Sequence, residues 1–215
     1  MDILVLIIYI VVFLYSVILH EIAHGWVANR FGDDTARISG RLSLNPLVHI
    51  DPFGSIIFPL LLYLSTGFAF GYAKPVPVNP YRLQGGKVAY RWVTLAGVLT
   101  NFSLAIISAL VFKIATQVFD LGPNNLGVIF FQLALLLNLV LAVFNSLPLP
   151  GFDGFNFLTT FDIFGRFISK TPIGNPLFMV RYGLLVSLLI LFLIWPFIGN
   201  IIYFFINLFS RIFGI

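Results

Sequence analysis

Residues 18–26 read Ile-Leu-His-Glu-Ile-Ala-His-Gly-Trp, and their charged and polar members interrupt an apolar run that begins at Ile3. On a helix, His20 and His24 stand one turn apart on the same face, with Cβ atoms about 5–6 Å apart, so both rings can share one metal ion. Glu21 is displaced around the helix, where its carboxylate can act as a base beside the metal. Ionisable groups inside a membrane segment are costly unless they are paired or metal-bound. The stretch therefore predicts a metal centre inside an apolar helix.

The composition is that of an integral membrane protein. Of the 215 residues, 60% are hydrophobic and 9% are charged, whereas soluble domains carry about 25% charged residues. The net charge of +4 would favour a nucleic-acid partner in a soluble protein. Here the basic residues lie in short loops between apolar segments, where membrane orientation explains them, and no nucleic acid is expected. The chain has no cysteine, so nitrogen and oxygen atoms must hold any metal.

The apolar segments predict an all-α polytopic membrane protein with about five transmembrane helices plus a re-entrant or extended membrane element. It is expected to form a single membrane-embedded domain, 1–215, with a core at 1–157 and C-terminal helices at 177–211. Pro196, Gly199 and Asn200 are expected to divide the last two helices, and residues 156–176 are expected to form a polar loop. The predicted helices cover residues 3–28, 88–119, 126–146, 177–200 and 201–211.

Small and polar positions in the second predicted helix suit close helix packing. They are Ala96, Gly97, Thr100, Asn101 and Ser103. Asn101 and Asn138 are interpreted as residues that form hydrogen bonds between helices.

The basic residues predict the orientation in the membrane, because cytoplasmic loops carry an excess of lysine and arginine. If the predicted helices alternate in direction, only Lys113 of the twelve basic residues lies toward the outside. Both ends of residues 55–70 are then cytoplasmic, so this segment is expected to enter and leave on one side. Such backbone is tolerated where protein or a water-filled cavity covers it. A full span at 55–70 is the alternative. The basic residues assigned to the cytoplasmic side are Arg30, Arg37, Arg41, Lys74, Arg82, Lys87, Arg91, Arg166, Lys170, Arg181 and Arg211.

The third metal ligand must come from elsewhere in the chain, because a catalytic zinc takes three protein ligands and keeps one position open. Glu21 is the only glutamate, which excludes a distant glutamate ligand. A third histidine six residues after His24 is also excluded, because that position is Arg30. His49 and the aspartates remain as candidates.

Asp153 is the favoured candidate. It follows a helix end in an apolar stretch rich in proline and glycine without a basic neighbour, and a buried carboxylate there needs a partner. The predicted topology brings it to the same side as the two histidines. A helix-ending turn is the alternative role for Asp153. His49 is interpreted as an interfacial histidine bonded to the backbone, with an auxiliary ligand or substrate-gate role as the alternative.

Five stretches together resemble the site-2 protease family of intramembrane zinc metalloproteases, in particular its short prokaryotic branch without PDZ or CBS domains. Two departures concern packing positions: Gly151-Phe152 stands where the family usually has Pro-Leu, and Val98 stands where it commonly has proline. The stretches are His-Glu-Ile-Ala-His-Gly at 20–25, Gly-Arg-Leu-Ser-Leu-Asn-Pro at 40–46, Gly-Tyr-Ala-Lys-Pro-Val-Pro-Val-Asn-Pro at 71–80, Ala-Gly-Val-Leu-Thr-Asn at 96–101 and Asn-Ser-Leu-Pro-Leu-Pro-Gly-Phe-Asp-Gly at 145–154.

The resemblance implies one catalytic Zn²⁺ held by His20, His24 and Asp153, with Glu21 as the general base. Asn145 is the candidate for steadying the oxyanion or the substrate backbone, and a helix cap or kink is its alternative role. The implied substrate is a transmembrane-helix peptide in the lipid bilayer, cleaved toward the cytoplasmic side of a prokaryotic cell membrane.

Two other functions compete with this one. A membrane metal-handling or transport protein would be expected to show paired repeats and further ionisable groups along a path, and neither is visible. A catalytically inactive relative that binds membrane segments is disfavoured by the intact Glu21.

Overall fold

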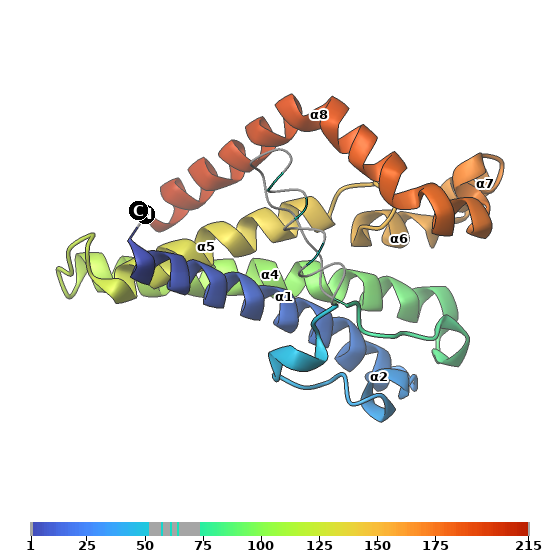
Figure 1. Cartoon of the computed structure of the whole chain (residues 1–215), viewed down its shortest axis with the longest axis horizontal. Helices are drawn as coiled ribbons and strands as arrows, with labels where there is room; N and C mark the ends of the chain where they lie inside the picture. Colours follow the sequence, from blue (N-terminus) through green and yellow to red (C-terminus); the bar gives the residue numbers. More distant parts are fainter. Residues whose placement is uncertain (1, 52–56, 58–60, 62–63, 65–73, 215) are drawn as a thin grey trace.

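The computed structural model describes residues 2–51, 57, 61, 64 and 74–214. Within these residues the secondary structure is helical, without a β-strand. Three long helices lie side by side along the long axis of the molecule: α1 (Ile3–Arg30), α4 (Gly86–Gln117) and α5 (Leu126–Asn145) (Figure 1). A fourth, α8 (Pro176–Phe213), stands apart from α1 along much of its length and packs on α5 and α4. Short helices connect them: α2 (Thr35–Ile38), η1 (Pro46–Val48), η3 (Pro80–Arg82), α6 (Asp153–Thr159), α7 (Asp162–Ser169) and η4 (Pro172–Gly174).

The long helices begin and end at residues suited to capping. The Asn125 side chain accepts a hydrogen bond from the Gly127 N–H at the start of α5 (2.9 Å), and Asn175 accepts one from the Leu177 N–H at the start of α8 (2.9 Å). These contacts satisfy N–H groups that have no partner inside a helix. Gly214 ends α8 with a φ of +67°, a conformation that glycine adopts without steric cost.

Small residues line the interface between α4 and its neighbours, where they let the helix backbones approach closely. Those buried along α4 are Ala89, Ala96, Gly97, Ala105 and Ala109. Asn101 is also buried, as expected of a residue that bonds between helices, whereas Ser103 is exposed and donates to the Leu99 carbonyl of its own helix. The prediction for Ser103 was therefore wrong, because it lies outside the stripe that faces the other helices.

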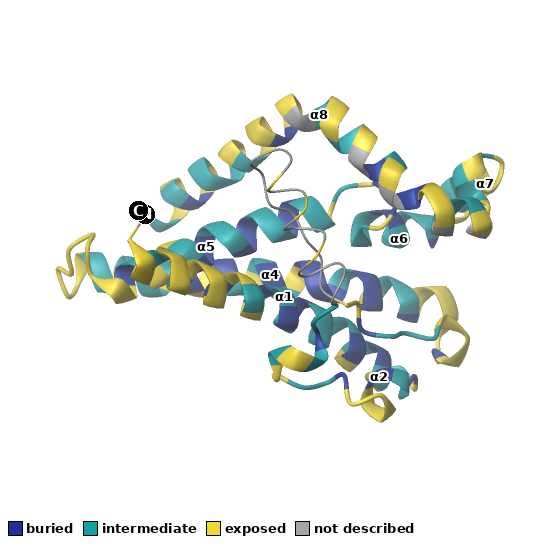
Figure 2. Cartoon of the chain, viewed as in Figure 1, coloured by how far each residue is buried: buried dark blue, intermediate teal, exposed yellow. Residues whose placement is uncertain are grey.

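The outward faces of the long helices are apolar. Figure 2 shows buried residues mainly on the facing sides and exposed residues outside; the exposed ones include Ile7, Ile10, Ile107 and Leu110. Among the described residues, four segments are long and apolar enough to cross a membrane: Ile3–Arg30, Gly86–Gln117, Leu126–Asn145 and Pro196–Phe213. An apolar surface of this extent needs a lipid surrounding, and the chain is an all-α polytopic membrane protein.

The C-terminal region differs from the sequence-based prediction. α8 runs unbroken from Pro176 to Phe213 with Pro196 inside it, whereas two helices divided near Pro196 were expected. Figure 1 shows α8 bending part-way along. A proline removes one helical hydrogen bond and kinks a helix, and in membrane-spanning helices local adjustments compensate for the lost bond so that the helix continues.

The predicted polar loop at 156–176 is also wrong, because α6, α7 and η4 occupy most of it. In α7, Ile163 and Phe167 share one face one turn apart, Asp162 lies in the first turn and Arg166 in the last. These charges complement the helix dipole. The predicted re-entrant element at 55–70 lies outside the described residues except for positions 57, 61 and 64.

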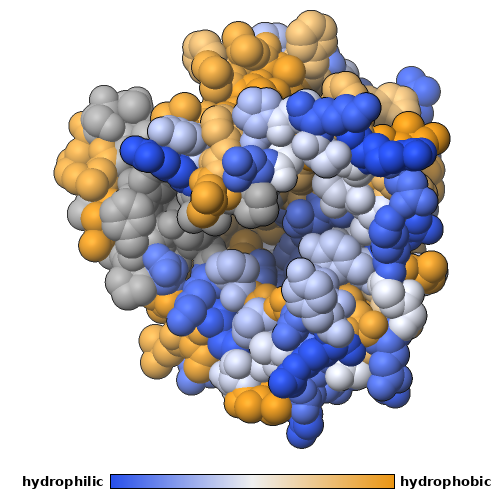
Figure 3. Space-filling view, turned by 90° about the vertical axis from the view of Figure 1, so that its right-hand side faces the viewer, coloured by the Kyte–Doolittle hydropathy of each residue, from blue (hydrophilic) through white to orange (hydrophobic). Residues whose placement is uncertain are grey.

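The two ends of the molecule differ in polarity. Gln117 Nε2 at the end of α4 donates to the Gly214 carbonyl (2.6 Å), so α8 ends beside the turn between α4 and α5. Arg211 therefore lies at the end that carries Lys113, and its predicted place with the other basic residues was wrong because α8 is one helix. Figure 3 looks onto the opposite end, with α2, α6 and α7, and shows hydrophilic residues gathered there.

Candidate metal centre

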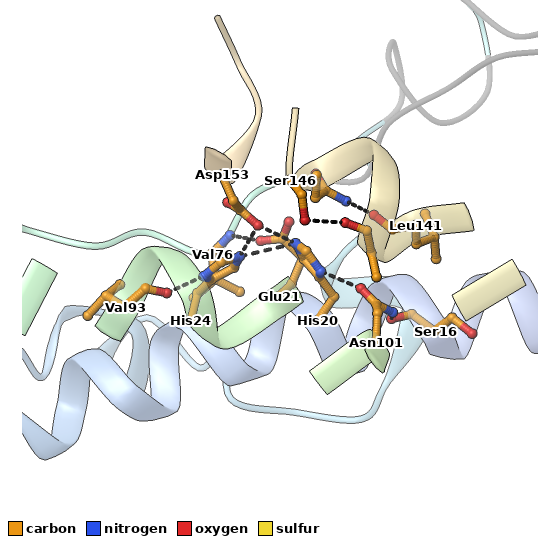
Figure 4. A network of polar contacts seen from close by, with 12 residues as sticks. Ser16, His20, Glu21, His24, Val76, Val93, Asn101, Leu141, Ser146 and Asp153 are labelled. Atoms are coloured by element: carbon orange, nitrogen blue, oxygen red, sulfur yellow. Dashed lines mark hydrogen bonds and ion pairs between the residues drawn. The ribbon is translucent and has the colours of Figure 1, made fainter. Parts of the chain in front are cut away.

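Three side chains from two helices converge at the interface of α1, α4 and α6 (Figure 4). His20 and His24 lie one turn apart on α1, and Asp153 is the first residue of α6. The two Nε2 atoms are 3.1 Å apart, and Asp153 Oδ2 lies 3.1 Å from that of His20 and 3.2 Å from that of His24. The side chains are 7%, 11% and 16% exposed, respectively. The structure thus brings together the three residues predicted as ligands, and one donor atom from each lies within 4.8 Å of the others.

Hydrogen bonds on the far side of each ring determine which nitrogen carries the proton. His24 Nδ1 lies 2.6 Å from the Val93 carbonyl, which can only accept, so Nδ1 donates. His20 Nδ1 lies 2.6 Å from Asn101 Oδ1, which likewise accepts. In neutral rings both Nε2 atoms then present lone pairs toward the cluster.

Two lone pairs and a carboxylate oxygen therefore face one another. Among the described residues no hydrogen-bond donor reaches the buried Oδ2 of Asp153. Lone pairs and a negative charge that repel one another in a buried site are stabilised by a cation placed between them. Rings whose outer nitrogen donates to a carbonyl are typical of metal-ligating histidines, and two imidazoles with one carboxylate form a donor set suited to zinc. The residues present fit a metal ion.

Gly97 on α4 provides the room around the two rings. A Cβ atom at this position would stand 2.4 Å from His20 Cε1 and 2.5 Å from the Nε2 atoms of both histidines. No side chain other than that of glycine fits there without displacing the rings. The close approach of α4 to α1 at this level therefore depends on Gly97.

The turn between α5 and α6 directs Asp153 toward α1. Gly151 adopts a φ of +92°, and a Cβ at Gly154 would lie 2.2 Å from the Ser146 carbonyl oxygen. The chain after α5 thus folds back tightly on the end of α5, which requires glycine at both positions. The Ser187 hydroxyl of α8 donates to the Pro150 carbonyl and so ties this turn to the last helix.

Glu21 contacts an extended segment, residues 74–79, that runs beside the C-terminal half of α1. Its Oε2 accepts the Val76 N–H at 2.7 Å. Gly25, one turn later, is buried under the same segment, because a Cβ there would stand 2.7 Å from Val76 Cγ1. Hydrogen bonding and packing together hold Val76 against the helix face that carries Glu21.

Asp33 holds the far end of that segment. Its side chain is fully buried and accepts the Asn79 N–H (2.6 Å), the Thr35 N–H (3.1 Å) and the Thr35 hydroxyl (2.5 Å). Burial acts to raise the pKa of Asp33, but the hydrogen bonds from Thr35 and Asn79 outweigh it and lower the pKa below its ordinary value. Asp33 is therefore an ionised structural carboxylate.

Two other predicted residues lie in different surroundings. Asn145 is the last residue of α5, and its Nδ2 donates to the Leu141 carbonyl of the same helix (3.0 Å). This is the contact expected of a helix-end residue, while a role toward substrate stays a prediction. His49 is 1% exposed and its Nε2 donates to the Ser43 carbonyl (2.7 Å), so it is bonded to the backbone as interpreted from the sequence.

Sequence reasoning missed three partners of the site. The Val93 carbonyl and the Val76 N–H are main-chain groups, which no residue type reveals. Asn101 was recognised as a bonding residue between helices, but its contact with His20 was not. The signal that was available is its position, since Asn101 lies four residues after Gly97 and therefore on the same face of α4.

The membrane-spanning helices and the cluster of two histidines and one aspartate define an integral membrane protein with a candidate metal site. The chain is 38% identical over 207 residues to "Putative zinc metalloprotease YwhC" of Bacillus subtilis (strain 168), an alignment that covers 95% of this chain and 91% of that protein. It belongs to the site-2 protease family.

More distant relatives carry the same kind of name. The chain is 34% identical over 152 residues to "Putative zinc metalloprotease Rip2" of Mycolicibacterium smegmatis (strain ATCC 700084 / mc(2)155), covering 67% of this chain and 53% of that protein. It is 33% identical over 144 residues to the Rip2 protein of Mycobacterium tuberculosis (strain ATCC 25618 / H37Rv), covering 66% and 52%. No protein-family model matches the chain. No solved structure matches it either.

Proposed function

We propose that this protein is an intramembrane zinc endopeptidase that hydrolyses peptide bonds within or near transmembrane segments of membrane proteins. Such cleavage serves regulated intramembrane proteolysis or the clearance of membrane remnants. The observation that carries the proposal is the convergence of His20, His24 and Asp153 between helices whose outer faces are apolar, with Glu21 next to His20. A zinc transporter would share the cluster but has no use for Glu21 as a base.

His20, His24 and Asp153 are the proposed ligands of one zinc ion. Zinc bound there would supply Lewis acidity, which lowers the pKa of a coordinated water toward about 7 and polarises a carbonyl. Glu21 would accept the proton of the attacking water and return it to the leaving amine. The Val76 N–H holds the carboxylate of Glu21 in one orientation, which favours this transfer because a positioned base loses less entropy on reaction.

The test is cleavage of a membrane-embedded model peptide by purified protein in lipid vesicles, with zinc content measured on the same samples. Glu21→Gln is expected to retain zinc and to lose cleavage by a factor of at least about 100, since general base catalysis contributes about 100- to 10,000-fold. Cleavage that survives the substitution would refute the role of Glu21. A soluble unfolded protein serves as the matched substrate, and equal cleavage of it would refute the restriction to membrane segments.

We propose that the metal centre lies toward the cytoplasmic side. The end that carries α2, α6 and α7 holds most of the basic residues, and the positive-inside rule assigns such an end to the cytoplasm. Because the chain has no cysteine, single substitutions at two exposed positions, Ser39→Cys and Asn124→Cys, label one end each. In intact cells a membrane-impermeant thiol reagent should label the second and spare the first. The opposite pattern would reverse the orientation.

A further inference from the structure

A chain of buried amides connects His20 to the backbone of two helices. Asn101 on α4 is 0% exposed and Asn138 on α5 is 2% exposed. Asn138 Nδ2 donates to the Ala134 carbonyl (2.9 Å) and to Ser16 Oγ (2.9 Å), while its Oδ1 accepts from Asn101 Nδ2 (2.7 Å). Asn101 Nδ2 also approaches the Ser16 carbonyl (3.4 Å), and its Oδ1 faces His20 Nδ1 (2.6 Å).

Backbone carbonyls determine the orientation of both amides, because a carbonyl accepts and cannot donate. The Ala134 carbonyl requires the nitrogen of Asn138, which turns the oxygen of Asn138 toward Asn101. That oxygen in turn requires the nitrogen of Asn101, which leaves the oxygen of Asn101 for His20. The ring of His20 must then carry its proton on Nδ1.

We propose that Asn138 acts through Asn101 to hold His20 in the Nδ1–H form, so that the Nε2 lone pair of His20 faces Asp153 and is ready for a metal ion. Asn101 and Asn138 are thus positioning residues for the metal centre. His24 needs no such device, since the Val93 carbonyl bonds its Nδ1 directly. The inference rests on the proposed zinc site for its function, while the tautomer of the neutral His20 ring follows from the amide contacts alone.

The amide of Asn101 can present either end to His20, and Asn138 decides which. Without the oxygen of Asn138, Asn101 Nδ2 keeps only the Ser16 carbonyl at 3.4 Å. A flipped Asn101 would donate to His20 Nδ1 and move the ring proton to Nε2, where it blocks coordination. Changes of this kind beyond the ligands typically lower metal affinity about 10- to 100-fold.

The first experiment determines the tautomers by NMR in zinc-free protein with ¹⁵N-labelled histidine, at an alkaline pH where the rings are neutral. The chain has 3 histidines, and the hydrogen bonds predict the Nδ1–H tautomer for His20 and His24. His49 donates through Nε2 to the Ser43 carbonyl, so it supplies an internal reference of the opposite form. Asn138→Leu should move His20 toward Nε2–H and lower zinc affinity about 10- to 100-fold, with His24 and His49 unchanged. An unchanged His20 would overturn the proposal.

The second experiment separates positioning from a general loss of packing. In Asn101→Asp an oxygen faces His20 Nδ1 in either orientation of the side chain, so Asn138 no longer determines which kind of atom His20 meets. Asn138→Leu should therefore lower zinc affinity in the wild-type background and leave it unchanged in the Asn101→Asp background. Equal losses in both backgrounds would show that Asn138 has only a structural role and would refute its action on His20 through Asn101.

Two controls complete the design. Asn138→Asp keeps an oxygen toward Asn101 and, with its carboxyl protonated in this buried position, still donates to the Ala134 carbonyl, so it should preserve the His20 tautomer. Ser108→Ala changes another buried polar residue of α4, away from the cluster, and should change neither readout. If the wild-type tautomers are as expected while the protein binds no zinc, the proposed enzymatic function is refuted, but the action of Asn138 on His20 through Asn101 is not.

Discussion

The half of α1 before Glu21 and the half after it are held by different kinds of contact. In the first half, Ser16 and His20 bond to asparagine side chains on α4 and α5. Glu21, and Asp33 just beyond the end of the helix, instead bond to main-chain groups of the extended segment 74–79, at Val76 and Asn79. Arg41, beyond the helix, donates to the Lys74 carbonyl (2.5 Å).

The difference follows from what each half packs against. Helices use most of their main-chain groups internally, so polar side chains between two helices bond largely to one another; the contact of His24 with the Val93 carbonyl of α4 is an exception. An extended segment leaves its N–H and C=O groups free, and these need partners when they are buried. The contacts before Glu21 thus depend on particular side chains, the asparagines of α4 and α5. The contacts of Glu21 and Asp33 depend on the main chain of the segment 74–79. Substitutions that affect the asparagine contacts should disturb the metal site, and those that affect the extended segment should disturb the surroundings of Glu21.

The largest effect on the metal site is expected for Gly97→Ala, which tests the part of α1 that contacts α4. The added Cβ would lie 2.4–2.5 Å from atoms of both histidine rings, so the rings must leave the cluster. Zinc affinity is expected to fall by at least about 100-fold, and cleavage with it. Gly199→Ala is the matched control, since its Cβ would meet no described atom within 4 Å. Zinc titration against a competing chelator measures the effect, and wild-type affinity in Gly97→Ala would contradict the packing argument.

Asp33→Ala tests the backbone-held half and should be the next largest. It leaves the N–H groups of Asn79 and Thr35 without their acceptor in a partly buried position. Each unpaired buried group costs about 1–3 kcal/mol, so the segment should open more readily by about 2–3 kcal/mol. Hydrogen exchange of residues 74–84 measures the loss, with zinc affinity as the control that should stay unchanged. Wild-type exchange in the variant would show that Asp33 does not hold the segment.

The same difference explains which parts of the site were predictable from the sequence. His20, Glu21, His24 and Asp153 are polar residues in apolar surroundings, so their cost in a membrane marks them, and the i, i+4 spacing places two of them on one face. Asn138 stands out for the same reason. Val76 and Val93 act through main-chain atoms, and valine in an apolar stretch carries no signal of that kind.

The helices were predictable where the apolar run is long and uninterrupted. α1, α4 and α5 lie within two residues of the expected bounds. Errors arose where weak local signals compete: Pro196 bends α8 instead of ending it, and the amphipathic periodicity of α7 is too short to separate from a loop. The wrong prediction for Arg211 followed from the error in α8. Two helices were expected to bring the chain back to the cytoplasmic side, whereas the single helix ends at the opposite end of the molecule.

A smaller effect is expected for Gly25→Ala. Its Cβ would lie 2.7 Å from Leu42 Cδ2 and Val76 Cγ1, which are side-chain ends, and 2.8 Å from Ala36 Cβ, which cannot rotate away. The segment should move slightly and weaken the bond between Val76 and Glu21. Because small misplacements near a reacting group lower catalysis, kcat is expected to fall about 10-fold with zinc retained. An equal loss in Gly199→Ala, or loss of zinc, would contradict this reading of the second half.

The smallest effect is the response of the 74–84 segment to acid. The pKa of Asp33 is lowered in the folded protein, so its stabilising contribution is fully present above the unfolded value of about 3.9 and is lost as the pH falls through the lower native value. The loss should be smaller than in Asp33→Ala, because a protonated carboxyl still accepts a hydrogen bond. Exchange of the Asn79 N–H, corrected for its intrinsic pH dependence, should accelerate only below about pH 4. Asp33→Asn removes the titrating group and keeps an acceptor oxygen, so its exchange should show no such step. A step that persists in Asp33→Asn would assign the acid response to another group and leave the backbone-held half of α1 independent of charge.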